Sequence, residues 1–145
     1  MSVAAPRFPV SIKGVIFVGG RVLLLENERR EWELPGGKLE SGEDPVDCLM
    51  REIAEELSLA VSVERLIDCW LYAIEGAGEV LIVTWGCAPL AAAMPRLSAE
   101  HRGLGLFTLD ELAALPMPEG YRRSIRRWAE VVTVANPSSA GKLMR

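Results

Sequence analysis

The sequence is poor in the residues on which several classes of protein depend. Its 145 residues include three cysteines and one histidine. The cysteines, Cys48, Cys69 and Cys87, are odd in number and lack Cys-x-x-Cys spacing, which argues against a disulfide framework and against a zinc site. This cysteine usage is typical of a reducing compartment, so we expect a cytoplasmic protein.

The chain also lacks long hydrophobic runs and an excess of basic residues. Its longest uncharged stretch, residues 80–95, is broken by Gly86 and Pro89 and is shorter than the roughly 20 apolar residues of a membrane span. The net charge of −4 gives no basic field for binding nucleic-acid phosphates. The N-terminus lacks a basic start followed by an apolar core, so we expect no secretory signal. From the short uncharged stretch and the net charge we expect no membrane insertion and no nucleic-acid partner.

What is present is the balance of a globular domain, with 50% hydrophobic and 25% charged residues. A chain of this length holds one domain with a sizeable core but not two of ordinary size. We expect a single domain over residues 1–135 and a loose C-terminal tail over residues 136–145. The sequence is compatible with a homodimer but does not indicate one.

Turn signals divide the chain into strands and helices. Gly19-Gly20 separates two apolar runs and predicts a β-hairpin, and the segment 76–78 separates two further strand-like runs. Pro35 and the two glycines after it are expected to interrupt regular structure. A helix is expected to begin near Pro45, because proline is tolerated in a first turn and acidic residues precede it.

Two more helices are predicted near the C-terminus. The first is short and follows a capping box, Thr108 with Glu111, and the second covers the end of the domain. The order of strands, helix, strands and helices indicates a sheet covered on both faces. The side chains expected to face the core are Val46, Leu49, Met50, Ile53 and Leu57 of the first helix and Tyr121, Ile125 and Trp128 of the last.

Three carboxylates, Glu52, Glu55 and Glu56, are spaced i, i+3 and i+4 on the first predicted helix. They are expected to project from one side, with the apolar stripe facing away. Like charges at this spacing destabilise a helix. One interpretation is a solvated acidic face; the other is a divalent cation, Mg²⁺ or Mn²⁺, because both ions prefer oxygen ligands.

The residues around these carboxylates resemble the signature of the Nudix hydrolases. That signature is glycine, five residues, glutamate, seven residues, Arg-Glu, an aliphatic, any residue, Glu-Glu, any residue, glycine and an aliphatic. Ser58 stands where the family has the second glycine, and the preceding Trp-Glu-Leu-Pro-Gly-Gly segment is also similar to the family. The matching residues are Gly37, Glu43, Arg51, Glu52, Ile53, Glu55, Glu56 and Leu59.

The resemblance implies an α+β fold, an α/β/α sandwich around a mixed β-sheet. It also implies metal-dependent hydrolysis of the diphosphate bond of a nucleoside diphosphate linked to another group, with water attacking phosphorus. By the same resemblance Glu52, Glu55 and Glu56 are ligands of Mg²⁺ or Mn²⁺, and Glu52 is a candidate base for the water.

The other residues of the signature are expected to support this site. Arg51 would orient the carboxylates through charge-assisted hydrogen bonds, although a helix arginine is more often a surface ion pair. Gly37 would let the preceding loop approach the helix closely. Glu43 is either a ligand or a cap, and the structural role is favoured.

Glu100 lies outside the signature and is a second candidate for metal ligand and base. It belongs to a predicted loop, residues 98–105, that Gly103 and Gly105 are expected to make flexible. Members of the resembled family often bring a glutamate from such a loop to the metal or the water. The adjacent His101 is expected to be a hydrogen-bonding or surface residue rather than a base.

The sequence does not identify the substrate beyond a small molecule of nucleotide type. Aromatic residues in predicted strands can stack on a base, but packing in the core is their usual role. Several arginines could bind phosphates, but the alternative is that they simply lie on a solvent-exposed face. The aromatic candidates are Trp70, Tyr72 and Trp85, and the arginines are Arg29, Arg30, Arg122, Arg123, Arg126 and Arg127.

Two other functions are compatible with the same fold. A non-catalytic nucleotide sensor would more naturally have lost a carboxylate, whereas every charged position of the signature is intact. An isoprenoid diphosphate isomerase would need an additional catalytic cysteine and acid, and Cys48 on the helix is a poor candidate.

Overall fold

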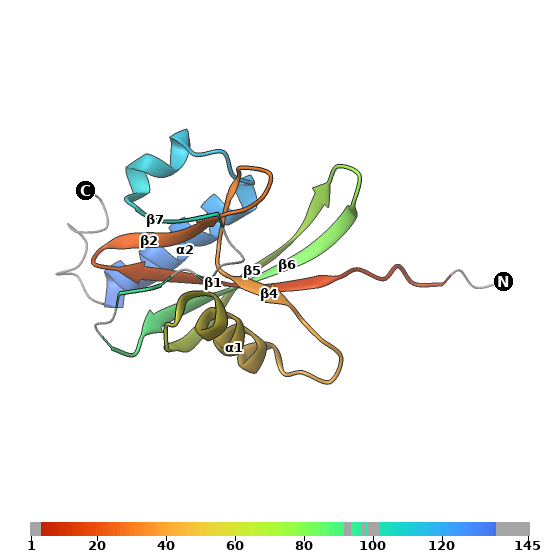
Figure 1. The fold of residues 1–145 in the computed structure, drawn as a ribbon, viewed down its shortest axis with the longest axis horizontal. Helices are drawn as coiled ribbons and strands as arrows, with labels where there is room; N and C mark the ends of the chain where they lie inside the picture. The colour runs from red at the N-terminus through yellow and green to blue at the C-terminus, as the bar shows by residue number, and fades with distance from the viewer. Residues whose placement is uncertain (1–3, 92–93, 97, 99–101, 136–145) are drawn as a thin grey trace.

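A computed structural model of the chain describes residues 4–91, 94–96, 98 and 102–135. Within these residues the chain forms a sheet, two α-helices and one 3₁₀ helix (Figure 1). The elements, in chain order, are β1 (Val10–Val18), β2 (Arg21–Glu26), β3 (Trp32–Glu33), β4 (Gly36–Lys38), α1 (Pro45–Leu57), β5 (Val61–Ile74), β6 (Gly78–Pro89), β7 (Gly103–Phe107), η1 (Leu109–Ala114) and α2 (Glu119–Ala135).

Strand β1 lies at the centre of the sheet. The main order is β3-β2-β1-β6-β5, while β4 also pairs with β1 and β7 with β2. The β1–β6 pairing is parallel and extends from Val10 opposite Leu81 to Ile16 opposite Cys87. The pairings of β1 with β2 and with β4 are antiparallel, so the sheet is mixed, as expected.

Both predicted hairpins are present. Gly19 and Gly20 join β1 to β2 with φ angles of 60° and 82°, which suit a tight turn between antiparallel strands. Gly76 and Gly78, with φ angles of 79° and 84°, lie at the turn between β5 and β6. These turns need positive φ angles that glycine adopts without steric cost, which is why they are readable from the sequence.

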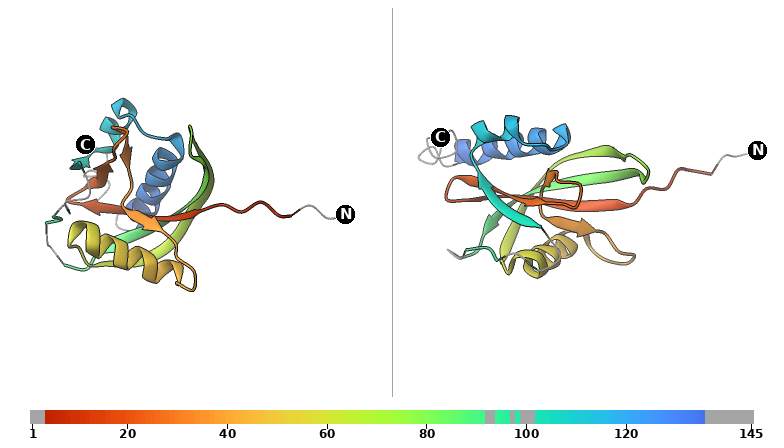
Figure 2. Two further views of the ribbon diagram at one scale, coloured as in Figure 1. Left: turned by 45° about the vertical axis from the view of Figure 1, so that its right-hand side comes forward. Right: turned by 45° about the horizontal axis from the view of Figure 1, so that its top comes forward.

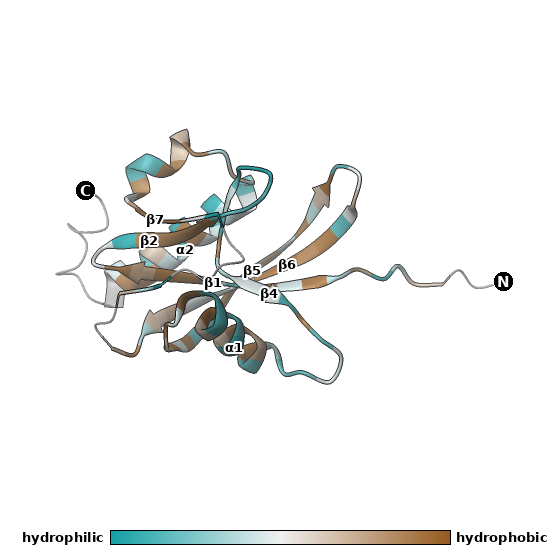
Figure 3. Ribbon diagram, viewed as in Figure 1, coloured by the Kyte–Doolittle hydropathy of each residue, from teal (hydrophilic) through white to brown (hydrophobic). Residues whose placement is uncertain are grey.

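Helices α1 and α2 cover opposite faces of the sheet (Figure 2). Alternation along β1 sends Ile12 and Ile16 to the α1 side and Val15 to the α2 side. Figure 3 shows the resulting apolar stretches along the central strands and a hydrophilic loop between β2 and β3. The helix residues in the two core clusters are Leu49, Ile53 and Leu57 of α1 and Tyr121, Ile125 and Trp128 of α2. The expected α/β/α sandwich is confirmed.

Helix α1 begins and ends with well-defined caps. The Asp44 carboxylate accepts a hydrogen bond from the Val46 N–H at 2.9 Å, and Pro45 occupies the first turn. At the other end Ser58 adopts the left-handed conformation, with φ 52° and ψ 38°, and its N–H donates to the Ala54 carbonyl. Ser58 therefore performs the backbone role of the glycine that it replaces in the signature.

Two positions of the predicted apolar stripe differ, since Val46 is only partly buried and belongs to neither core cluster, and Met50 lies in solvent. Met50 is 42% exposed, whereas Cys48 is fully buried. The buried face of α1 centres on Leu49, Ile53 and Leu57, and Met50 lies about 100° around the helix from Leu49. A long apolar side chain at that edge remains in solvent.

Pro35 interrupts regular structure as expected, but the glycines of two segments that were expected to lack regular structure belong to short strands. β3 and β4 lie on either side of Pro35, and Gly37 of β4 pairs with Ile12 of β1. Gly103 and Gly105, expected in a flexible loop, belong to β7 and pair with β2. Leu104 and Leu106 of β7 pack against the α1-side core, and this alternation decides the conformation of the segment.

The remaining predicted helix and the chain ends complete the fold. The Thr108 N–H donates to the Glu111 carboxylate at 2.8 Å, which confirms the capping box, although the helix that follows is of the 3₁₀ type. None of the helices in the described ranges is long and apolar enough to span a membrane. The predicted tail, residues 136–145, lies outside the described residues.

Candidate active site

The three carboxylates of α1 occupy different environments. The side chain of Glu55 is 60% exposed and that of Glu52 is 21% exposed. Glu56 as a residue is only 6% exposed. The expectation that all three face away from the core is therefore wrong for Glu56, which points toward the sheet.

Glu56 is held by the backbone of β4. Its Oε1 accepts a hydrogen bond from the Gly36 N–H at 2.9 Å, a contact between residues twenty positions apart. Burial is the main influence on this carboxyl and raises its pKa to about 7, while the nearby Lys13 ammonium and the Gly36 N–H oppose the rise. The carboxylate is thus desolvated, and a cation beside it would offset that cost.

Two consecutive glycines allow β4 to lie close to both β1 and α1. A Cβ on Gly36, whose φ is 143°, would lie 1.9 Å from the Ile12 carbonyl oxygen. A Cβ on Gly37 would lie 2.3 Å from Cδ of Glu52. The close approach expected at Gly37 is therefore present, and Glu52 and Glu56 lie against the same glycine backbone.

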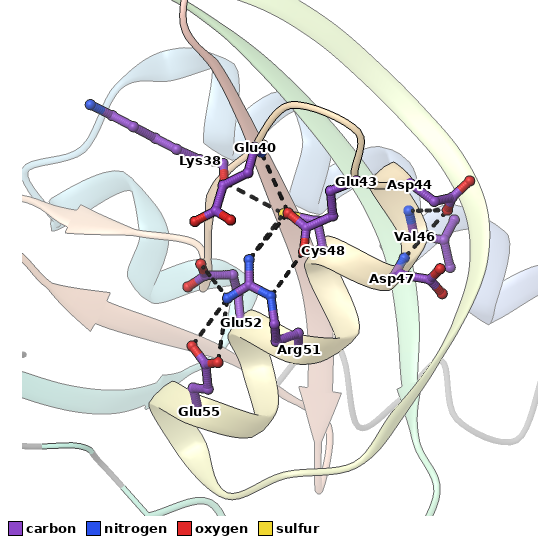
Figure 4. Close-up of polar contacts among 10 residues, drawn as sticks. All are labelled: Lys38, Glu40, Glu43, Asp44, Val46, Asp47, Cys48, Arg51, Glu52 and Glu55. Carbon is purple, nitrogen blue, oxygen red and sulfur yellow. Dashed lines mark hydrogen bonds and ion pairs between the residues drawn. The ribbon is translucent and has the colours of Figure 1, made fainter.

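Arg51 links the acidic residues of the signature (Figure 4). Its Nε and Nη2 donate to the two carboxylate oxygens of Glu43 at 2.9 and 3.2 Å. Its Nη1 lies 3.2 Å from Glu52 Oε1 and 3.2 Å from Glu55 Oε2. The hydrogen bond to Glu43 is the main reason why the pKa of Arg51 lies above its ordinary value.

Glu43 is correspondingly stabilised as a carboxylate. The hydrogen bond from Arg51 is the main cause that lowers its pKa. Its Oε1 also accepts a weaker bond from the Glu40 N–H at 3.4 Å. Since both oxygens are engaged by Arg51, the arrangement favours the structural role for Glu43.

A largely buried lysine, Lys13, and its partly buried partner, Glu33, were not anticipated from the sequence. Lys13 of β1 is 7% exposed and lies opposite Gly36, and its Nζ is 3.9 Å from Glu33 Oε1. The Asn27 side-chain amide donates to the other oxygen of Glu33 at 3.4 Å. A signal was available, because Lys13 is a lone charge in an otherwise uncharged strand between Val10 and Val18.

The aromatic candidates for base stacking have partners within the protein. Trp70 makes an edge contact with Tyr121, with ring centroids 5.1 Å apart, and Trp85 packs against the α1-side core. The Tyr72 hydroxyl donates to Glu31 Oε1 at 3.0 Å, which joins β5 to the loop between β2 and β3. Core packing accounts for both tryptophans.

Most of the candidate phosphate-binding arginines also have structural partners. Arg122 donates to the carbonyls of Leu112, Leu115 and Met117 and so caps the end of η1. Arg29 pairs with Glu31 at 3.3 Å. Arg123 and Arg127 both pair with Asp68, and Arg126 pairs with Glu119.

The described residues contain no group of three His, Cys, Asp or Glu side chains already arranged to hold a metal ion. The reason is visible in the contacts, since Arg51 occupies Glu52 and Glu55 while Glu56 turns to Gly36. The donor atoms are nonetheless all carboxylate oxygens, which are the ligands that Mg²⁺ and Mn²⁺ prefer. Glu100 and His101 lie outside the described residues.

A cavity of about 470 Å³ lies elsewhere, between η1 and α2. Because α2 and α1 cover opposite faces of the sheet, this cavity is separate from the carboxylates of α1 (Figure 2). Its lining residues are Leu109, Asp110, Ala113, Arg126, Ala129, Glu130 and Thr133.

Comparison with known proteins agrees with the geometry of the signature. A profile of the NUDIX domain matches residues 7–128. The chain belongs to the Nudix family. It is 31% identical over 110 residues to a MutT-like protein of Streptomyces ambofaciens, and the match covers 74% of this chain and 69% of that protein.

Two further Nudix proteins show the range of the likeness. An 8-oxo-dGTP diphosphatase of Proteus vulgaris is 49% identical over 37 residues, which are 26% of this chain and 33% of that protein. The crystal structure of a MutT Nudix hydrolase from Burkholderia pseudomallei has a TM-score of 0.69 and 28% identity, covering 84% of this chain and 98% of that one. The family membership supports a pyrophosphohydrolase of Nudix type.

Proposed function

We propose that this Nudix protein is a metal-dependent hydrolase that cleaves the diphosphate bond of a nucleoside diphosphate linked to another group. The observation that carries the proposal is the placement of Glu52 and Glu56 against the Gly36-Gly37 backbone, with Arg51 beside them. An acidic face with a purely structural role would not need the buried carboxylate of Glu56. Nor would it need Gly37, which leaves room for Glu52.

Glu52, Glu55 and Glu56 would hold the Mg²⁺ or Mn²⁺ ions. Bound there, the metal would neutralise phosphate oxygens and lower the pKa of a water molecule. The buried Glu56 gives the site a desolvated carboxylate, while the exposed Glu55 can change rotamer at little cost. Glu56 would therefore be a fixed ligand and Glu55 an adaptable one.

Arg51 would retain its bond to Glu43 while Glu52 and Glu55 turn to the metal. The guanidinium contacts Glu43 through Nε and Nη2 but reaches Glu52 and Glu55 through Nη1 alone. Releasing the Nη1 contacts leaves the pairing with Glu43 intact. Arg51 is thus a positioning residue that holds the carboxylates in place before the metal binds.

The base that activates the water is Glu52 or Glu100. Glu52 is partly exposed and lies beside Gly37, on the side of the helix that faces β4. Glu100 remains a candidate from the sequence. A Glu100→Gln variant that loses roughly 10²–10⁴-fold in kcat at saturating metal would identify Glu100 as the base, and wild-type kinetics would leave Glu52 in that role.

The two alternative functions are less well supported. A sensor has no need for the full set of signature carboxylates, all of which are present. For an isomerase, the Cys48 thiol is fully buried, and burial raises its pKa to about 11. That thiol is protonated at neutral pH and does not supply an isomerase's reactive cysteine.

The experiment that tests the function is a panel of nucleoside triphosphates, dinucleotides and nucleotide sugars, incubated with Mg²⁺ or Mn²⁺ and analysed for products. We expect nucleoside monophosphate together with diphosphate from a nucleoside triphosphate, or together with the phosphorylated second group from a dinucleotide or nucleotide sugar. The matched variants are Glu56→Gln, expected to lose activity by orders of magnitude, and Glu64→Gln, an exposed glutamate of β5, expected to retain it. Full activity in Glu56→Gln, or after exhaustive chelation, would contradict the proposal.

Metal binding is tested separately by thermal unfolding. Mg²⁺ or Mn²⁺ should raise the melting temperature of the wild type, because binding to the folded state alone stabilises it by mass action. The shift should shrink in the Glu52→Gln/Glu56→Gln double variant. An equal shift in both proteins would place the metal elsewhere.

A further inference from the structure

Lys13 is largely buried, and its ammonium group is paired with a single carboxylate among the described residues. Its residue is 7% exposed, and among the described residues its one charged contact is Glu33, at 3.9 Å from Nζ, which is longer than a hydrogen bond. An ammonium group has three donors, so Lys13 retains donors that a bound anion could accept from.

The position of Lys13 indicates that use. It lies opposite Gly36 in the β1–β4 pairing, and the Gly36 N–H binds Glu56. The Lys13 charge acts on Glu56, where it counters the effect of burial on the carboxyl. Lys13 thus lies across the β1–β4 pairing from the glycine that holds Glu56, and its charge is within electrostatic reach of that carboxylate, so a diphosphate bound to a metal at Glu56 would come into the same region.

We propose that Lys13 is a substrate-binding residue, whose ammonium donates to an anionic oxygen of the substrate's diphosphate beside Glu56. The inference rests on the proposed function. Glu33 positions the ammonium through their ion pair, and the Asn27 side-chain amide donates a hydrogen bond to Glu33. Since a lysine is a compact point charge, the contact recognises an anionic phosphate oxygen and not the base.

A purely structural role makes a different prediction. If Lys13 only neutralised Glu33 and Glu56, removing one carboxylate along with the lysine would restore the balance of charge. If Lys13 binds phosphate, the removal of Glu33 does not replace the lost contact. The double variant Lys13→Met/Glu33→Gln separates these roles.

The test measures binding and kinetics in Lys13→Met, which keeps the length of the apolar stem. Calorimetry with a non-hydrolysable α,β-methylene nucleoside triphosphate and Mg²⁺ should give a Kd about 10- to 100-fold above wild type, the range of a charge-assisted hydrogen bond. KM should rise by a similar factor for substrates with different bases. The Mg²⁺-induced melting shift without nucleotide should persist, because metal ligands are intact.

The outcomes are distinct. Wild-type Kd and KM in Lys13→Met, or recovery of wild-type Kd in Lys13→Met/Glu33→Gln, would overturn the assignment of Lys13. Lys13→Gln, which still offers Glu33 a hydrogen-bond donor, should lose affinity as well and serves if Lys13→Met does not fold. A wild type that neither binds the analogue nor hydrolyses any substrate of the panel would overturn both proposals, whereas an active wild type with an unaffected Lys13→Met would overturn only this one.

Discussion

Arg51 binds both carboxylate oxygens of Glu43, with Nε 2.9 Å from one oxygen and Nη2 3.2 Å from the other. Glu43 lies just before α1, and Arg51 lies about two turns into the helix. The bidentate contact fixes the plane of the guanidinium, so that Nη1 is directed at Glu52 and Glu55 (Figure 4). Glu43 thus sets the direction in which Arg51 meets Glu52 and Glu55, although Glu43 itself is distant from them in sequence.

The first prediction is that Glu43→Gln lowers kcat about tenfold, because the amide accepts only one strong bond from Arg51 and the guanidinium loses its fixed plane. The metal concentration that gives half-maximal rate should change less than threefold. Glu40→Gln, an exposed glutamate three residues earlier, is the control and should be neutral. Rescue of Glu43→Gln by excess metal would instead make Glu43 a ligand.

The second prediction concerns Gly37. In Gly37→Ala the added methyl would lie 2.3 Å from Cδ of Glu52, so the carboxylate must move. We expect kcat to fall at least tenfold, with a change in the free energy of unfolding of about 1 kcal/mol or less, because Glu52 is not in the core. Gly42→Ala is a useful comparison, since nothing lies within 4 Å of its added methyl and only its φ of 80° is strained. A fully active Gly37→Ala would mean that the position of Glu52 is not critical.

The third prediction is that Ser58→Gly stabilises the protein by about 0.5–1 kcal/mol. Ser58 has φ 52° and ψ 38°, a conformation that costs an L-residue free energy and costs glycine almost none. Urea unfolding monitored by tryptophan fluorescence measures the difference. Ser58→Ala should be no more stable than wild type, and a less stable Ser58→Gly would show that the Ser58 side chain contributes more than its backbone strain costs.

The fourth prediction is a pH dependence of stability in the absence of metal. The pKa of Glu56 is about 7 in the folded protein against an ordinary value of 4.5, so the folded state holds the proton more tightly than the unfolded chain. The resulting stabilisation is fully present below about pH 4.5 and is lost as the pH rises through about 7. It amounts to about 3 kcal/mol at most.

Urea unfolding in chelator at several pH values tests this dependence. Comparison with Glu56→Gln removes the contribution of the other titrating groups. In this variant the decline in the free energy of unfolding between about pH 5 and pH 8 should be flatter than in wild type. Parallel curves for the two proteins would show that Glu56 titrates at its ordinary pKa.

The elements that could be predicted from the sequence depend on local signals. The hairpin at Gly19-Gly20 needs two positive φ angles, and the N-terminal cap of α1 needs only Asp44 and Pro45. The location of Glu52, Glu55 and Glu56 on a helix follows from the local apolar period, whereas their expected role came from the resemblance to the family. In each case the residues that decide the conformation lie within a few positions of one another, so a single sequence contains the information.

The features that were missed depend on which strands become neighbours. Whether Glu56 is solvated is decided by β4, which reaches α1 only because Gly36 pairs with Lys13 of β1. Whether residues 103–107 form a loop or a strand is decided by the free edge of β2. Propensity gives no information on such pairings, and two glycines in five residues favoured the wrong state for β7.

The parallel pairing of β1 with β6 also constrains how the chain folds during synthesis. The partners Ile12 and Val83 are separated by about half the chain, and a parallel pair has no tight turn to close it. As the polypeptide leaves the ribosome, β1 can first meet only β2 and β4, and the far side of β1 stays open until the β5–β6 hairpin has emerged. Until then that edge carries unpaired backbone N–H and C=O groups, which can pair with another nascent chain.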